Sequence, residues 1–66
     1  MEFRDEVDGN LVKKEELVKG DLVANIGSIT KDGWTFEYWY NDDRDVEFNF
    51  NTPINENIVL FAKCFS

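Results

Sequence analysis

The side chains that could do chemistry in this 66-residue sequence are carboxylates and one thiol, because it contains no histidine. Four acidic residues lie close together near position 45: Asp42, Asp43, Asp45 and Glu47. A calcium site needs about six to eight oxygen ligands and a tight turn that often contains glycine. This segment has no glycine and places Arg44 in its middle. It is therefore interpreted as a solvated acidic loop, and we expect neither a metal nor a cofactor.

Catalysis is not expected of this chain. A carboxylate pair that works as acid and base needs a cleft that raises one pKa. A core of this size supplies only about 3–5 kcal/mol, so such a cleft is hard to build. Cys64 lacks an activating histidine, with only Lys63 beside it, so we interpret it as a small apolar filler near the end of the last strand. The four glycines are too scattered for a phosphate-binding loop.

Aromatic rings are the remaining candidates for a site. Trp34, Tyr38, Trp39 and Tyr40 could form a stacking platform for sugars or bases, but core packing explains most of these rings. Aromatic residues make up 15% of the chain, which is typical of β-structure with a compact aromatic core. We expect Phe36 and Trp39 in that core.

The charge of the chain limits its partners. Fourteen acidic residues against seven basic ones give a formal net charge of -7. This sign argues against nucleic acid and against anionic membrane surfaces, and leaves neutral or basic partners. No apolar run approaches the roughly 18–20 residues of a membrane span, and residues 1–6 lack the apolar region of a signal peptide. We therefore expect either a cytosolic protein or a module of a longer secreted chain.

The elements that position these residues are expected to be strands. Turn signals at short intervals predict one domain over residues 1–66, mainly β and α+β at most, with little helix. The apolar segment Ile58–Ala62 is expected inside the sheet and covered on both faces. Val46–Phe50 alternates apolar and polar residues and is expected at an edge. Thr52–Ile54 is compatible with one helical turn. The expected strands span residues 3–7, 11–18, 34–40, 46–50 and 58–62.

Charge predicts the register of the first hairpin. A loop over Asp8–Leu11 places Val7 opposite Val12 and forms three pairs of opposite charge, each worth about 0.2–1 kcal/mol. These pairs are Glu6–Lys13, Asp5–Lys14 and Arg4–Glu15. A two-residue turn would instead place Arg4 opposite Lys13, so the longer loop is predicted. The pattern leaves open which member of Leu11/Val12 and of Leu17/Val18 is buried.

Three segments carry a resemblance to a known family: Thr30–Asp42, Phe48–Ile54 and Ile58–Lys63. In order and spacing, over residues 30 to 64, they resemble the Listeria–Bacteroides repeat, the B-repeat of internalin-type bacterial surface proteins. The resemblance implies a small β-grasp-like, ubiquitin-like sheet domain. It also implies a non-catalytic module that lies beside neighbouring repeats of the same parent chain, outside the cell or in the bacterial wall. Such a module is expected to act as a spacer and to bind proteins or host surfaces.

The departures from the family signature point to a candidate interaction surface. Trp34 replaces a tyrosine, Tyr38 replaces a glycine and Cys64 replaces a closing tryptophan. Because Phe36 and Trp39 have opposite strand parity, both can enter one core only if the strand bends or bulges between them. Without the glycine, Tyr38 must carry its side chain through that bulge or project it outward.

We therefore place the interaction surface at Trp34 and Tyr38. The alternative function is a free-standing, cytoplasmic acidic inhibitor or adaptor that docks a basic protein.

Overall fold

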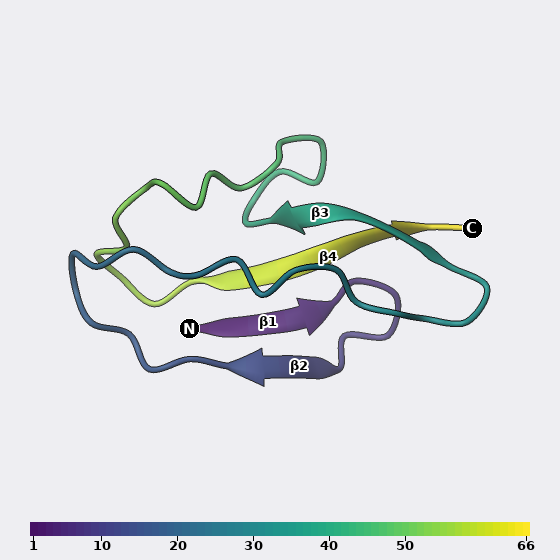
Figure 1. The fold of residues 1–66 in the computed structure, drawn as a ribbon, viewed down its shortest axis with the longest axis horizontal. Helices are drawn as coiled ribbons and strands as arrows, with labels where there is room; N and C mark the ends of the chain where they lie inside the picture. Colours follow the sequence, from purple (N-terminus) through teal and green to yellow (C-terminus); the bar gives the residue numbers. More distant parts are fainter.

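The computed structural model describes residues 1–66 and shows one four-stranded mixed β-sheet. Its strands are β1 (Glu2–Asp5), β2 (Leu11–Lys14), β3 (Thr35–Tyr40) and β4 (Val59–Phe65). The spatial order is β2-β1-β4-β3, with β1 and β4 parallel at the centre and antiparallel pairs on either side (Figure 1). The mainly β class is confirmed, and the little helix that we expected is reduced to none. Accordingly, the fold offers no helix that could cross a membrane.

The prediction that Ile58–Ala62 lies inside the sheet is confirmed by β4, which pairs with β1 on one side and with β3 on the other. The prediction that both of its faces are covered is wrong. Every second residue of β4, from Leu60 to Cys64, is buried, whereas the residues between them are only half-buried. One face of the sheet therefore holds the core, and the other remains partly open to solvent.

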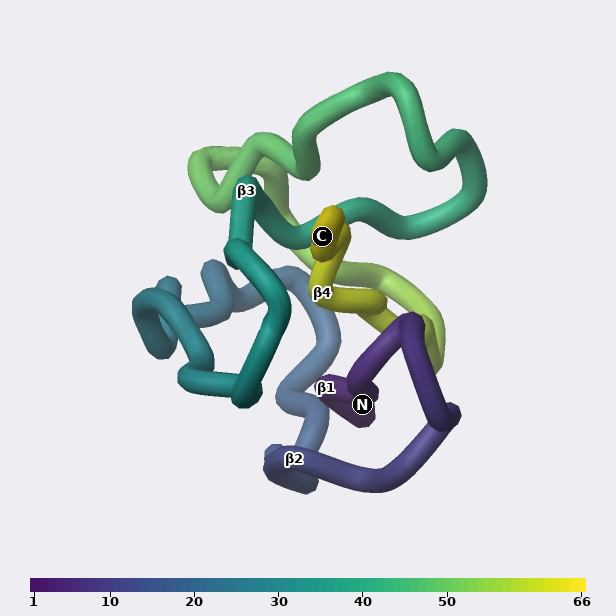
Figure 2. The backbone as a smooth tube through the Cα atoms, turned by 90° about the vertical axis from the view of Figure 1, so that its right-hand side faces the viewer, coloured from purple at the N-terminus to yellow at the C-terminus, as the bar shows by residue number.

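The core face is covered by the connection between β2 and β3, which lie at opposite edges of the sheet. Residues 22–30 cross that face without regular secondary structure, and both views place this segment over one side of the sheet (Figures 1 and 2). Val23, Ile26 and Ile29 are half-buried and pack against the core. Gly27 has a φ of 85°, which glycine adopts without steric cost. The core thus lies between this crossing segment and the sheet.

Trp39 in β3 joins the parts of this small core. Trp39 is 2% exposed, and its ring meets the ring of Phe3 edge-on, with the two ring centroids 5.0 Å apart. Its indole Nε1 donates to the Gly27 carbonyl at 2.9 Å, and its own carbonyl accepts from the Phe48 N–H at 2.8 Å. The core position expected for Trp39 is confirmed, and half-buried Phe36 packs beside it at 5.6 Å.

The bulge predicted between Phe36 and Trp39 is present. Between Phe36 and Tyr38 the register advances by two residues on β3 but by only one on β4. Glu37 is therefore the extra residue of the bulge. Each side chain of β3 after Glu37 points to the face opposite the one it would take in a regular strand. This shift is what brings Phe36 and Trp39 to the same face of the sheet.

The hairpin of β1 and β2 is confirmed, but the register predicted from charge is wrong. Phe3 lies opposite Lys13 and a bulge follows, so none of the three expected charge pairs forms. Asp5 is 7% exposed, and its carboxylate accepts from the Val7 N–H at 2.8 Å, so the chain turns directly after β1. Exposed ion pairs contribute only about 0–1 kcal/mol, which is less than burial of Phe3 contributes.

β2 is exposed along its whole length, so both Leu11 and Val12 face solvent. In the second pair that the sequence left open, Leu17 is half-buried and Val18 is 58% exposed. β2 is a short edge strand with two lysines and a bulge, features that discourage pairing with another chain.

The strand and edge predicted over Val46–Phe50 are wrong, because the sheet edges are β2 and β3. Only the Phe48 N–H bonds to β3, and Asn49 then begins a turn in which its side chain accepts from the Asn51 N–H at 2.9 Å. Such local bonds compete with a strand ladder. Phe48 and Phe50 nevertheless keep their inward facing and meet edge-on at 4.9 Å.

The helical turn predicted at Thr52–Ile54 does not form either. The Ile54 N–H donates to the Asp21 carbonyl at 3.0 Å, and the Ile54 carbonyl accepts from the Gly20 N–H at 2.7 Å. Ile54 is buried at this bridge. These long-range bonds use the backbone groups that a helical turn would need.

Trp39→Ala should leave the domain largely unfolded at 25 °C. Removal of a buried ring costs about 3–5 kcal/mol, which equals the stability expected of a core this small. Thermal unfolding followed by circular dichroism measures this, with Trp34→Ala as the control, since Trp34 is 40% exposed and should cost much less. A cooperative transition of Trp39→Ala within a few degrees of the parent would contradict the anchor role.

Candidate functional site

The face of the sheet opposite the core, called the outer face below, carries aromatic and cationic side chains from β3 and β4. Tyr40 and Phe61 stack with ring centroids 5.7 Å apart and planes 28° apart. Lys63 Nζ lies 4.8 Å from the centre of the Tyr38 ring. All four residues are half-buried. The outer face is therefore a partly covered surface of rings, and Tyr38 belongs to it.

Tyr38 is fixed by two hydrogen bonds of its hydroxyl group. The hydroxyl donates to the Arg44 carbonyl at 2.8 Å and accepts from Lys63 Nζ at 2.9 Å. The hydrogen bond that Lys63 donates to this hydroxyl is the largest cause that raises the pKa of Lys63 above its usual value. The ring of Tyr38 thus projects outward, the second of the two outcomes that its replacement of a glycine allowed.

Trp34 lies apart from Tyr38, in a turn that precedes β3. Its N–H donates to the Lys31 carbonyl at 3.0 Å, and the residue is 40% exposed. No hydrogen bond or ring contact joins Trp34 to Tyr38. The structure therefore gives two separate aromatic positions, and the interaction surface assigned to them stays a prediction.

Glu6 is the residue of the outer face that sequence reasoning missed. Its side chain is 18% exposed, and its carboxylate accepts bonds from Arg44 Nε, from the Tyr40 hydroxyl at 2.7 Å and from the Cys64 N–H at 3.2 Å. These partners are 38, 34 and 58 residues away in the sequence. No local pattern could have found them, and charge alone pointed to Lys13. Glu6 thereby ties β1 to β3, to β4 and to the loop that follows β3.

The electrostatics of this cluster follow from its bonds. Burial raises the pKa of Glu6, but the bonds from Arg44, Tyr40 and the Cys64 amide outweigh it, so the net pKa lies below the usual value. Burial and the Glu6 carboxylate together raise the pKa of Tyr40 to about 12. Burial, then the charges of Asp5 and Glu6, raise the pKa of the Cys64 thiol. Cys64 is 2% exposed and stays protonated at neutral pH, which confirms it as a buried filler.

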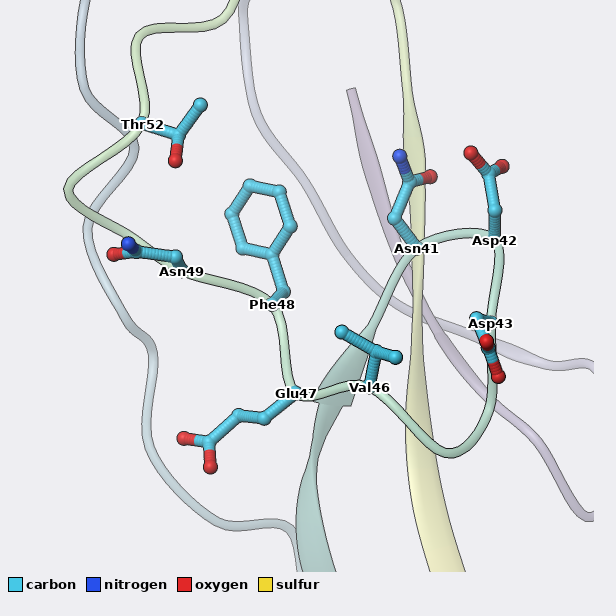
Figure 3. Close-up of a pocket in the computed structure, with 8 residues that line it drawn as sticks. All are labelled: Asn41, Asp42, Asp43, Val46, Glu47, Phe48, Asn49 and Thr52. Carbon is cyan, nitrogen blue, oxygen red and sulfur yellow. The ribbon is translucent and has the colours of Figure 1, made fainter.

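The acidic loop borders a hollow on the surface (Figure 3). Asp42 and Asp43 lie on one side of it, whereas Glu47 extends toward the other side, so the three carboxylates do not converge. Phe48 and Val46 lie between them. No group of three or more carboxylate or thiol side chains in the structure is arranged to hold a metal ion. The full lining is Asn41, Asp42, Asp43, Val46, Glu47, Phe48, Asn49 and Thr52.

A family model described as the Listeria-Bacteroides repeat domain matches residues 2–63. The chain belongs to this family. The match adds β1 and β2 to the half in which the resemblance was first seen, and it makes the chain a repeat module of a family associated with bacterial surface proteins. No curated protein and no solved structure shows a significant match. The ubiquitin-like shape therefore stays a prediction.

The Glu6 cluster predicts how acid destabilises the repeat. A carboxylate whose folded pKa is lowered stabilises the fold above its unfolded pKa, near 4.5, and loses this effect as the pH falls through the lower folded pKa. Glu6→Gln should lower the free energy of unfolding by about 1–3 kcal/mol at pH 7. This difference from the parent should vanish once the pH is below the folded pKa of Glu6.

Urea unfolding between pH 7 and pH 2 measures this difference. Glu56→Gln is the control, since Glu56 is exposed and forms no ion pair. The other carboxyls with lowered pKa, Glu2 and Asp8, titrate in all three proteins and cancel in the comparison. A constant difference across the whole pH range would contradict the role given to the Glu6 charge.

The divergent carboxylates of the acidic loop predict that calcium leaves the repeat unchanged. A ligand at a hundred times its dissociation constant adds about 2.7 kcal/mol, which would raise the melting temperature by many degrees. Differential scanning calorimetry with millimolar calcium or with a chelator should therefore give the same transition. A rise of several degrees that Asp43→Asn removes would overturn this prediction.

Proposed function

We propose that this repeat is a non-catalytic spacer and interaction module of a bacterial cell-surface or secreted protein. The observation that carries the spacer role is the parallel pairing of the first and last strands. Glu2 lies opposite Val59, and β4 continues for six more residues to Phe65. At about 3.3 Å per residue, the chain therefore leaves the sheet about 20 Å from the level at which it enters.

Opposite exit and entry points suit a chain of linked copies. Each copy adds its own length to the chain instead of returning it to the starting point, as a hairpin-like module would. The longest dimension of the domain, 36 Å, runs horizontally in Figure 1, with the C-terminus at its right-hand end. This supports a row of modules that carries some other part of the parent protein away from the cell surface.

The interaction role rests on the two aromatic positions that depart from the family signature. Trp34 is exposed, and the half-buried Tyr38 presents its ring on the outer face. Rigid aromatic side chains provide contact area at a small entropic cost. We propose that they give this copy its own preference for a host-surface or protein ligand.

The spacer role predicts the size of a two-copy chain. Two copies joined directly should exceed the single domain in largest dimension by at least about 20 Å, the separation between entry and exit. Small-angle X-ray scattering measures both dimensions. Copies that fold back against each other, with little gain in length, would contradict the spacer role. A parent gene that encodes only this module would favour the acidic adaptor instead.

The interaction role predicts a loss of binding without a loss of fold. Trp34→Ser combined with Tyr38→Thr should keep dispersed amide signals in NMR, because neither ring belongs to the buried core. Binding of the labelled domain to animal cells should fall. Val46→Ser is the control, since Val46 is 59% exposed but lies in the acidic loop. Equal binding by both variants would remove the assigned surface, and unfolding of the double variant would make the two rings structural.

A further inference from the structure

The pairing of β1 with β4 also determines how this domain responds to a pull on its two ends. The two strands are parallel, with a continuous register from Glu2 opposite Val59 to Asp5 opposite Ala62. A force that draws the two chain ends apart therefore pulls β1 and β4 past each other along their own direction. It does not open the pair from one end.

This direction of loading matters because of the way ladder bonds share a force. In a parallel pair the hydrogen bonds are evenly spaced along the strands. A force along the strands loads all of them at once, so they must break together. A force across the strands at one end loads only the terminal bond, and the bonds then break one after another.

The structure lengthens this pair beyond the strands themselves. At the start of the pair, the N–H of Glu2, the first residue of β1, donates at 3.2 Å to the carbonyl of Ile58, which precedes β4. Beyond Asp5, the Cys64 N–H donates to the Glu6 carboxylate at 3.2 Å, so a side chain supplies the acceptor that the ended strand no longer offers. Arg44 and Tyr40 hold that carboxylate in place.

Both central strands are also held by contacts outside the β1–β4 ladder. Phe3 of β1 and Leu60 of β4 are fully buried in the same core. β4 is held on its far side by antiparallel pairing with β3. Sliding β1 past β4 must therefore break the ladder and pull buried side chains through the core in the same step.

We infer that the repeat is a load-bearing module, in which the β1–β4 pair, with Glu6 as its last support, resists stretching of the parent chain. This inference rests on the proposed function, since only a module linked at both ends of a surface chain carries such a load. The function it adds is mechanical: the spacer keeps its length under tension, as when a cell is held by its surface protein against flow.

Single-molecule pulling with optical tweezers tests the inference on the whole domain in two geometries. In the first, handles are attached at Met1 and Ser66. In the second, they are attached at Met1 and Glu56, an exposed residue just before β4, so that the same pair is opened from its start. The folded protein is the same in both cases, and only the direction of the force differs.

We expect a several-fold higher unfolding force between Met1 and Ser66 than between Met1 and Glu56 at the same loading rate. Forced unfolding reports the unfolding rate and not the equilibrium stability, so equal stabilities do not hide this difference. Equal forces, or a lower force between the chain ends, would overturn the load-bearing role.

Two variants test the part assigned to Glu6. Glu6→Ala removes the acceptor of the Cys64 N–H and should lower the force in the end-to-end geometry more than in the opening geometry. Tyr40→Phe is the matched control, because it removes one bond to Glu6 but leaves the Cys64 bond in place. A Glu6→Ala effect that is the same in both geometries would contradict its role in the pair.

The outcome separates this inference from the spacer role. A two-copy chain that extends as proposed but shows equal forces in the two geometries contradicts the load-bearing inference alone. In the other case, the unfolding force differs strongly between the two geometries while linked copies fold back on each other. That result contradicts the spacer role, and without a spacer the domain would not carry the proposed load.

Discussion

The structure depends on Trp39 more than on any other residue. In a chain with eight buried residues, the three segments that could separate from one another all meet at this one side chain and its backbone. Its ring packs on Phe3 of β1, its indole N–H holds the crossing segment at Gly27, and its carbonyl holds the following loop at Phe48. The crossing segment has no helix or strand of its own, so this bond and its apolar contacts are what keep it on the sheet.

Trp39 can take this position only because β3 contains a bulge. In a regular strand without this bulge, Phe36 and Trp39, three residues apart, would face opposite sides of the sheet. The bulge also decides what the outer face displays, because it turns Tyr38 and Tyr40 away from the core. The bulge thus sets both the anchor of the core and the surface to which the interaction role is assigned.

On the outer face, Glu6 joins separate segments through hydrogen bonds, as Trp39 joins the segments around the core. Its carboxylate satisfies three donors from three segments, and one of them, the Cys64 amide, belongs to the central strand. The chain has twice as many acidic as basic residues, yet this carboxylate accepts three hydrogen bonds, one of them from an arginine. The acidic side chains near position 45 are exposed and make fewer contacts: Asp43 accepts from the Asp45 N–H at 2.9 Å, and the Asp45 carboxylate lies 3.8 Å from Lys63 Nζ.

The sequence by itself determined the class of the fold, the central place of Ile58–Ala62, the bulge in β3 and the family. Each of these follows from local parity, apolar content or motif spacing, which are properties of neighbours along the chain. The register of the first hairpin, the edges of the sheet and the Glu6 cluster were decided only by tertiary structure. Val46–Phe50 alternates as a strand should, but Asn49 turns it away after one bond to β3. Charge pairs across the hairpin are weak beside the burial of Phe3 and the turn made by Asp5, and both of these require the rest of the sheet to be in place.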